Sequence, residues 1–263
     1  MIVPLLLAAI FAELTAADLA ALGPEEKGRA AAFEMERRNF DGFGDLTIQE
    51  ELIIENRYGQ KVTRQISVYM LEVPGDGDKV LVVLSGPADV RGTAALVHGH
   101  KTTPDDMWVY SPAVERVRRI SAENKGGAFM GSDFANEDIT HPEPEKFTRY
   151  RWLRDEVYEG ENCFVVERYP LENSSIYSRQ VLWIDHAQFR ILKVDFFNKN
   201  NEHEKTLHFL GYQKYLENHW RPGELKMVNH FTGTSTRVVF KEWKFRVGLK
   251  DSDFTLHGLR IER

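Results

Sequence analysis

Apolar and polar positions alternate along most of the chain from Asp45 onwards, and this pattern predicts β-strands. The apolar residues Ile66, Val68 and Met70 alternate with residues that carry a polar group. This spacing of two is expected when one face of a strand is buried. Similar segments occur at 80–84, 94–98, 107–110, 149–153, 163–169, 181–185, 189–197, 205–215, 224–229 and 235–244, with a further candidate near Arg260. Short stretches rich in Gly, Asn, Asp and Pro separate them, so we predict a meander of antiparallel hairpins. Because no helical pattern alternates with the strands, a doubly wound α/β fold is not expected.

One helix is predicted before the strands. Pro24 at the first helical position and two acidic residues in the first turn indicate its start. The helix is expected to run to about Asn39, and the sequence DGFG at 41–44 ends it. A single helix cannot cover both faces of such a sheet. Some inward aromatic side chains are therefore expected to line a cavity.

The segment from Ile120 to Pro144 breaks the strand pattern. It is polar and rich in glycine, yet it carries Phe129, Met130 and Phe134. A loop of this length inside a compact β domain is often functional. With no repeat and no visible domain boundary, we predict one domain in which this segment acts as a lid.

The first residues predict export. Residues 1–11 form an apolar run of the length of a signal-peptide core, too short to span a bilayer, and small residues follow it. We place cleavage after Ala17, with Ala16 as the alternative, so that residues 1–17 are the signal peptide and 18–263 the single domain. The run lacks a preceding Lys or Arg, which leaves an uncleaved anchor or a buried helix as alternatives.

Cysteine usage and charge narrow the class further. Cys163 is the single cysteine and the formal net charge is −6. No internal disulfide can form, which favours a bacterial periplasm over a secreted eukaryotic protein, and Cys163 is expected to be a buried small hydrophobe. No cysteine follows the apolar run, so a lipid-modified N-terminus is not expected. The mixed, mildly acidic surface argues against nucleic-acid binding.

Two groups of residues could carry enzymatic chemistry. His98 and His100, two apart on a strand, lie near Asp105 and Asp106 and could hold a metal ion, although solvated residues at a hairpin tip are the simpler interpretation. In the lid, an acid/base pair drawn from the carboxylates Asp133, Glu137 and Asp138 competes with Asp133 capping a helical turn, which we favour. We expect no cofactor and no metal, and we predict that the protein is not an enzyme.

Arginines cluster at two places on the predicted strands. Arg116, Arg118 and Arg119 form one cluster, and the other lies within residues 149–154. Alternate arginines on a strand share one face and could contact phosphate headgroups, so Arg116 and Arg118 are candidates for such contacts. A solvated face with paired acids is the alternative.

An ordered set of motifs resembles the LolA-like outer membrane lipoprotein-sorting family of bacterial periplasmic proteins. The segments are 87–93, 105–113 (DDMWVYSPA), 116–120, 129–134 (FMGSDF), 137–138, 158–160, 183–185, 220–222 and 251–255. The resemblance covers essentially the whole mature chain. It implies a mostly β fold with some α-helix: a curved, unclosed antiparallel β half-barrel, with an N-terminal helix and a loop or helix lid over its concave face.

The resemblance also implies a function. Such proteins are similar to carriers that shield lipoprotein acyl chains, and members of this branch are often linked to RND-type exporters of the inner membrane. We therefore expect a periplasmic carrier or chaperone for lipoprotein acyl chains or another lipid. A periplasmic accessory subunit of an RND-type exporter is the alternative, and a metal-dependent hydrolase is a distant third. The candidate cavity and lid residues are Phe33, Leu96, Trp108, Tyr110, Phe129, Met130, Phe134 and Phe196.

Overall fold

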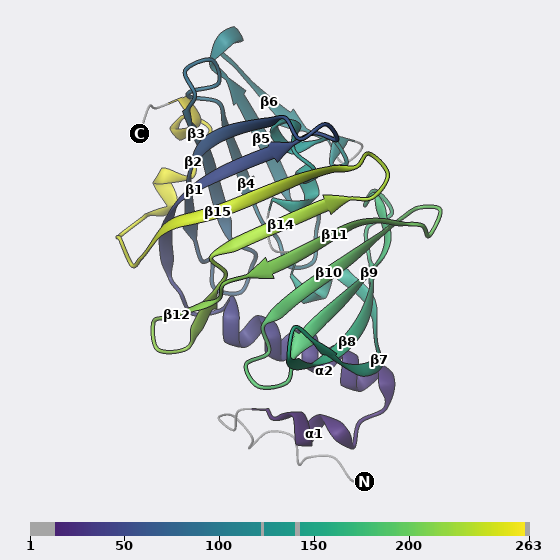
Figure 1. The fold of residues 1–263 in the computed structure, drawn as a ribbon. Coiled ribbons are helices and arrows are strands. Elements are labelled where there is room, and N and C mark those ends of the chain that lie inside the picture. Colours follow the sequence, from purple (N-terminus) through teal and green to yellow (C-terminus); the bar gives the residue numbers. More distant parts are fainter. Residues whose placement is uncertain (1–13, 122–123, 140–142, 261–263) are drawn as a thin grey trace.

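The computed structural model describes residues 14–121, 124–139 and 143–260, and most of them form one curved antiparallel sheet (Figure 1). Thirteen strands lie in the order β6-β5-β4-β3-β2-β1-β15-β14-β11-β10-β9-β8-β7. Their bounds are β1 Asp45–Glu55, β2 Lys61–Leu71, β3 Lys79–Gly86, β4 Ala94–His98, β5 Asp106–Ser111, β6 Arg116–Ile120, β7 Phe147–Tyr158, β8 Glu161–Pro170, β9 Tyr177–Asp185, β10 Ile191–Asn198, β11 His203–Leu210, β14 Glu224–Asn229 and β15 Thr234–Phe245. A small hairpin of β12 (Gln213–Tyr215) and β13 (His219–Arg221) stands apart. The predicted unclosed antiparallel sheet is confirmed.

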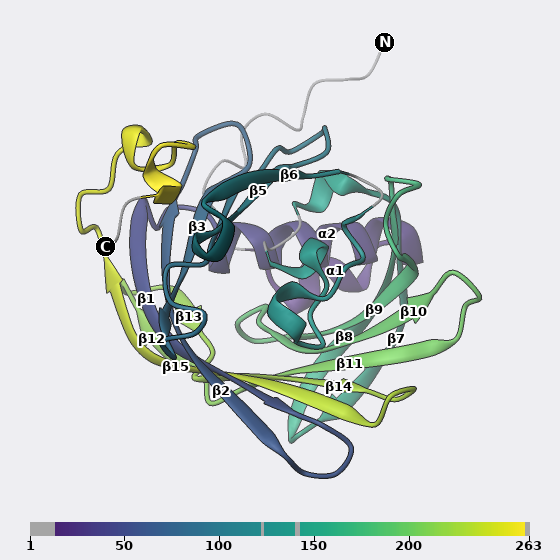
Figure 2. The same cartoon turned by 90° about the horizontal axis from the view of Figure 1, so that it is seen from above.

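The sheet consists of two meanders joined by a hairpin from the C-terminal part of the chain. Strands β1 to β6 form one meander and β7 to β11 the other. The hairpin of β14 and β15 lies between them: β15 pairs with β1 from Leu46–Phe245 to Glu55–Ser235, and β14 pairs with β11. In the part of the chain that the structure describes, the outermost strands β6 and β7 each pair on one side only, so the sheet curves strongly without closing (Figure 2).

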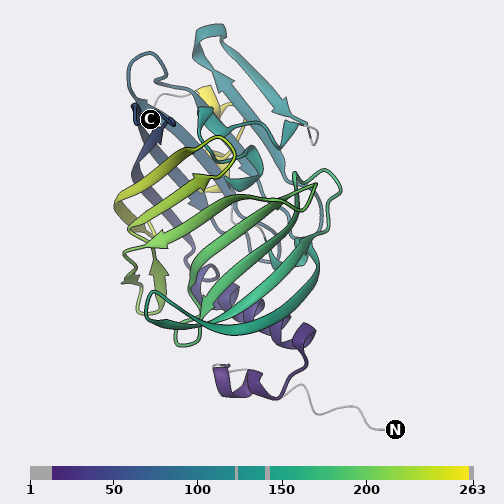
Figure 3. The ribbon, with the colours of Figure 1, turned by 45° about the vertical axis from the view of Figure 1, so that its right-hand side comes forward.

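The predicted helix is α2 (Pro24–Asn39), and it crosses one end of the concave face (Figure 3). Its Gly28 lies against the backbone of β7, where an added Cβ would come within 2.6 Å of the Trp152 nitrogen. The short α1 (Ala16–Ala20) packs on α2 through the buried Leu19. In the part of the chain that is described, no helix is long and apolar enough to cross a membrane.

The N-terminal export signal stays a prediction. Residues 1–13 lie outside the described residues. The expected cleavage position after Ala17 falls inside α1, whose N-cap Thr15 shares a capping box with Asp18.

The convex face also carries apolar clusters. Leu81, Leu96, Phe254 and Leu259 form one of them, because the 3-10 turns Asp251–Asp253 and Gly258–Arg260 fold over the outside of β3 to β5. The strand predicted near Arg260 is therefore wrong. Cys163 is fully buried in another cluster on the outside of β8 to β10, in agreement with its predicted role.

The close approach of α2 to β7 gives a stability prediction. Gly28→Ala should lower the free energy of unfolding by about 2 kcal/mol, because the new methyl group meets backbone atoms that cannot move away easily. Urea denaturation measures the change. Gly23→Ala is the matched control, since its Cβ would have 3.9 Å of clearance and its φ of −62° suits alanine, and it should change stability by less than about 1 kcal/mol. Equal effects of the two substitutions would contradict the packing argument.

Candidate ligand cavity

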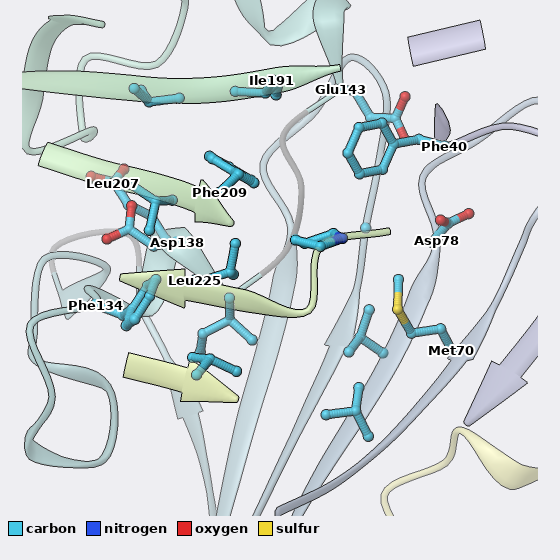
Figure 4. Close-up of a pocket in the computed structure, with 18 of the residues that line it drawn as sticks. Phe40, Met70, Asp78, Phe134, Asp138, Glu143, Ile191, Leu207, Phe209 and Leu225 are labelled. Atoms are coloured by element: carbon cyan, nitrogen blue, oxygen red, sulfur yellow. The ribbon is translucent and has the colours of Figure 1, made fainter. Parts of the chain in front are cut away.

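A cavity of about 360 Å³ lies between the concave face of the sheet, α2 and the lid. Its walls are mainly aliphatic and aromatic side chains that alternate with outward residues along each strand. Examples from both halves of the sheet are Ile48, Ile66, Val82, Val194, Leu207 and Leu225. Figure 4 shows Phe134 and Asp138 on one side of this space and Asp78 and Glu143 on the other, with apolar side chains between them. The volume of this cavity and its mainly apolar lining are typical of a site that binds a small molecule.

The lid, residues 124–139, turns its two aromatic rings inward. It contains the 3-10 turns Phe129–Gly131 and Asn136–Asp138, and the Phe129 amide donates to the Phe134 carbonyl at 2.7 Å. Both rings are buried and both line the cavity. The lid therefore closes the cavity with hydrophobic surface, as expected from its three large apolar residues.

The lid is attached to β15 through Asp133, near its middle. The Asp133 carboxylate accepts hydrogen bonds from the hydroxyls of Thr234 and Thr236, the latter at 2.7 Å, and its amide donates to Thr236 at 3.0 Å. The prediction that Asp133 caps a helical turn is wrong. Asp138 does so instead, by accepting from the Ala135 amide at 2.7 Å.

The C-terminal end of the lid is attached near the start of β9. The Glu137 carboxylate accepts from the Ile176 amide at 2.9 Å, and Asp138 accepts from the Tyr177 hydroxyl at 2.9 Å. Burial is the main cause that raises the pKa of both carboxyls, with Glu137 at about 7. Both carboxyls thus serve to fix this end of the lid.

A second set of carboxyls lies at the end of the cavity next to α2. Burial raises the pKa of Asp78 to about 7 and that of Glu143 to about 8, and neighbouring acidic residues add to both shifts. Asp105 instead forms an ion pair with Lys146. Arg221 donates to the Asn39 carbonyl, and burial lowers its pKa to about 10. At neutral pH this end thus carries less charge than its composition suggests.

The predicted ligand residues divide into three groups. Phe129, Phe134 and Phe196 line the cavity, and Met130 packs beside it with a left-handed backbone, φ 52°. Phe33 on α2 places its ring edge against Tyr150, outside the lining. Leu96, Trp108 and Tyr110 lie on the other face of the sheet, in the cluster with Phe254.

The position of these three residues corrects the prediction. Successive residues of a strand point to opposite faces, and the cavity side of β4 and β5 is occupied by Ala95, Val97 and Met107. Leu96, Trp108 and Tyr110 are buried by the C-terminal turns instead. They are therefore not cavity residues.

The remaining candidates do not meet at the cavity. Arg116 and Arg118 are exposed on the edge strand β6. His98 bonds to the Phe254 carbonyl at 2.8 Å, whereas His100 bonds to Asp76 at 2.9 Å. Within the described ranges, no cluster of three or more His, Cys, Asp or Glu side chains is arranged to hold a metal ion.

Charged residues on cavity-facing strand positions were missed by the sequence reasoning. Glu50 lies two residues after Ile48 and two before Leu52 on β1, and Arg168 lies two residues after Val166 on β8. Each therefore points to the same face of the sheet as these buried neighbours. A charge that interrupts a buried face was the signal that could have found them.

Solved structures provide the family. A domain from Vibrio parahaemolyticus, assigned to the outer membrane lipoprotein-sorting proteins, is 42% identical, with a TM-score of 0.87 over 90% of this chain and 99% of that chain. The chain belongs to the outer membrane lipoprotein-sorting family. The family model of an uncharacterized protein matches residues 76–260 of this chain.

Two further structures resemble the LolA-like chain. A DUF1329 family protein from Desulfovibrio piger is 30% identical, with a TM-score of 0.85 over 90% of this chain and all of that chain. A LolA superfamily protein from Nitrosomonas europaea is 21% identical, with a TM-score of 0.71 over 88% of this chain and 98% of that chain. The two proteins share the same fold. No curated protein matches the chain.

The attachment of the lid to β15 can be tested by hydrogen exchange. Thr236→Val keeps the shape of the buried side chain but removes the hydroxyl that bonds Asp133. We expect amide exchange in residues 124–139 to become about tenfold faster, since a buried carboxylate loses a partner. Thr206→Val is the control, because Thr206 is also buried and bonds a carboxylate, Asp195, on the opposite face. Unchanged exchange in the lid would show that the bond does not hold it.

The raised carboxyl pKa values predict a pH dependence of stability. Glu50 and Glu143, each with a pKa of about 8, bind protons more tightly in the folded than in the unfolded state, as do Asp78 and Glu137 at about 7. The stabilisation from these four carboxyls is therefore fully present below their unfolded-state pKa of about 4 and is lost as pH rises to their folded-state values. Between pH 7 and pH 8.5 the free energy of unfolding should fall by about 1–3 kcal/mol in urea titrations. A constant or rising stability over this window would contradict the assignment.

Proposed function

We propose that this protein is a periplasmic carrier that shields the apolar part of a lipoprotein or another lipid inside the cavity. The observation that supports this most directly is the cavity itself: about 360 Å³, walled by apolar side chains from both halves of the sheet, beneath a lid of two inward phenylalanines. Each methylene moved from water into such a space contributes about 0.8 kcal/mol. The family membership and the predicted leader support the periplasmic location.

Release of the ligand requires that the lid can open. The lid is held by a few polar contacts, among them Asp133 to β15 and the carboxyls of Glu137 and Asp138 to the region of β9. Such contacts can be broken and remade one at a time, whereas the strands of the cavity wall are joined by ladders of backbone hydrogen bonds. We propose that the lid is the moving part of the carrier.

The proposed ligand contacts follow from the lining. From the candidates predicted from the sequence, Phe129, Phe134 and Phe196 remain, and Leu207, Phe209 and Leu225 join them (Figure 4). Arg116 and Arg118 stay predicted headgroup contacts, and an exporter of the RND type stays a predicted partner.

Uptake of a fluorescent fatty acid tests the carrier function. Delipidated wild-type protein should bind cis-parinaric acid, and Leu225→Trp should raise the Kd about tenfold, because the larger ring fills space that the acyl chain needs. Phe209→Trp, also on the lining, should act in the same direction.

The neighbouring position provides the control. Lys226 is exposed and points away from the cavity, so Lys226→Trp should leave the Kd within about twofold. Circular dichroism would show that each variant is folded. No uptake by the wild type, or equal uptake by Leu225→Trp and Lys226→Trp, would overturn the proposal.

A further inference from the structure

Glu50 is an acidic residue in the middle of an apolar cavity wall. It lies on β1 between Ile48 and Leu52, and its cross-strand partners are Ile66 on β2 and Phe240 on β15. All four neighbours line the cavity, as does Glu50 itself. The carboxyl is thus surrounded by hydrocarbon on the wall and faces the space that the ligand would occupy.

The adjacent glutamate shows that this placement differs from an ordinary surface charge. At Glu50 the register between β1 and β15 shifts, and Lys241 is the residue passed over in the pairing. Lys241 forms an ion pair with Glu51 at 2.9 Å. Glu51 points to the outer face of the sheet, because neighbouring residues of a strand point to opposite faces. The outward carboxylate is therefore paired, whereas the inward one receives no such partner.

Among the described residues, no side chain or backbone group bonds or pairs with the Glu50 carboxyl. Burial alone raises its pKa to about 8, so it is mainly protonated at neutral pH and offers one hydroxyl donor and one carbonyl acceptor. Two other cavity carboxyls have protein partners: Asp138 bonds Tyr177, and Glu172 pairs with Lys125 at 2.6 Å.

An unpaired carboxyl disfavours a purely hydrocarbon ligand. A polar group that is desolvated without a hydrogen bond costs about 1–3 kcal/mol, and an alkyl chain lying against Glu50 would impose this cost. A ligand with an oxygen atom at this depth would avoid it. The arrangement therefore selects for an apolar molecule with a polar group inside its body rather than only at its end.

We propose that Glu50 is a specificity-determining contact for a hydroxyl or carbonyl oxygen within the body of an otherwise apolar ligand, such as a hydroxylated acyl chain. The proposal rests on the carrier function proposed above. The ligand would then be recognised in two ways, by burial of its apolar part and by a polar contact with Glu50 on β1.

Competition binding at neutral pH tests the contact. The probes are stearic acid and a series of monohydroxylated stearic acids that differ only in the position of the hydroxyl, each displacing cis-parinaric acid. In the wild type we expect at least one isomer to bind about tenfold more tightly than stearic acid. Glu50→Leu should abolish this preference and bind stearic acid more tightly than the wild type does. Glu50→Gln keeps a donor and an acceptor and should retain the preference.

The outcomes separate the two proposals. If stearic acid binds but no isomer is preferred, or if Glu50→Leu keeps the preference, the Glu50 contact is overturned and the carrier function stands. If stearylamine is preferred to every hydroxylated acid, Glu50 acts as an ionised partner of a cation, and the neutral contact is overturned. If the wild type binds none of the probes, the carrier function itself fails.

Discussion

The pairing of β15 with β1 is the interaction on which the rest of the structure depends. It joins strands almost two hundred residues apart in the chain into a continuous ladder from Leu46–Phe245 to Glu55–Ser235. Without it the two meanders would be separate sheets with no common concave face. The same strand supplies Val238, Phe240 and Trp243 to the cavity wall and the threonines that hold the lid. The cavity wall and the attachment of the lid therefore depend on the same strand.

The cavity combines apolar walls with carboxyls whose charge is suppressed by burial. This follows from a single cause, since removal from water disfavours the ionised form. At the lid the carboxyls of Glu137 and Asp138 are used as hydrogen-bonding groups that fix a loop, and near α2 the charge of Lys101 opposes part of the effect of burial on Glu143. At Glu50 burial is the one cause that acts on the pKa. The same physical effect therefore acts on carboxyls that anchor the lid and on the carboxyl to which we assign selectivity.

The sequence was sufficient for most of the strands and for α2 but not for the identity of the inward face. Alternation of apolar and polar residues identified β2 and most later strands, and Pro24 with its acidic first turn located α2. In β4 both faces are apolar, because the C-terminal turns cover the outside, so periodicity could not tell Ala95 from Leu96. Similarly, hydrogen bonds from Thr234 and Thr236 to Asp133 span about a hundred residues, and no local pattern reveals them. The lid was recognised because its phenylalanines contradict its polar composition.

The open edges at β6 and β7 have a mechanical consequence. In a closed barrel the number of strands and their stagger fix the diameter, so widening the interior means breaking backbone hydrogen bonds. In the described part of the chain the last strands on either side have no partner to lose, and side-chain contacts such as Lys146 with Asp105 lie nearby. The curvature of the sheet can therefore change while every ladder stays intact. The width of the concave side is limited by how far the sheet bends rather than by a fixed number of strands and a fixed stagger.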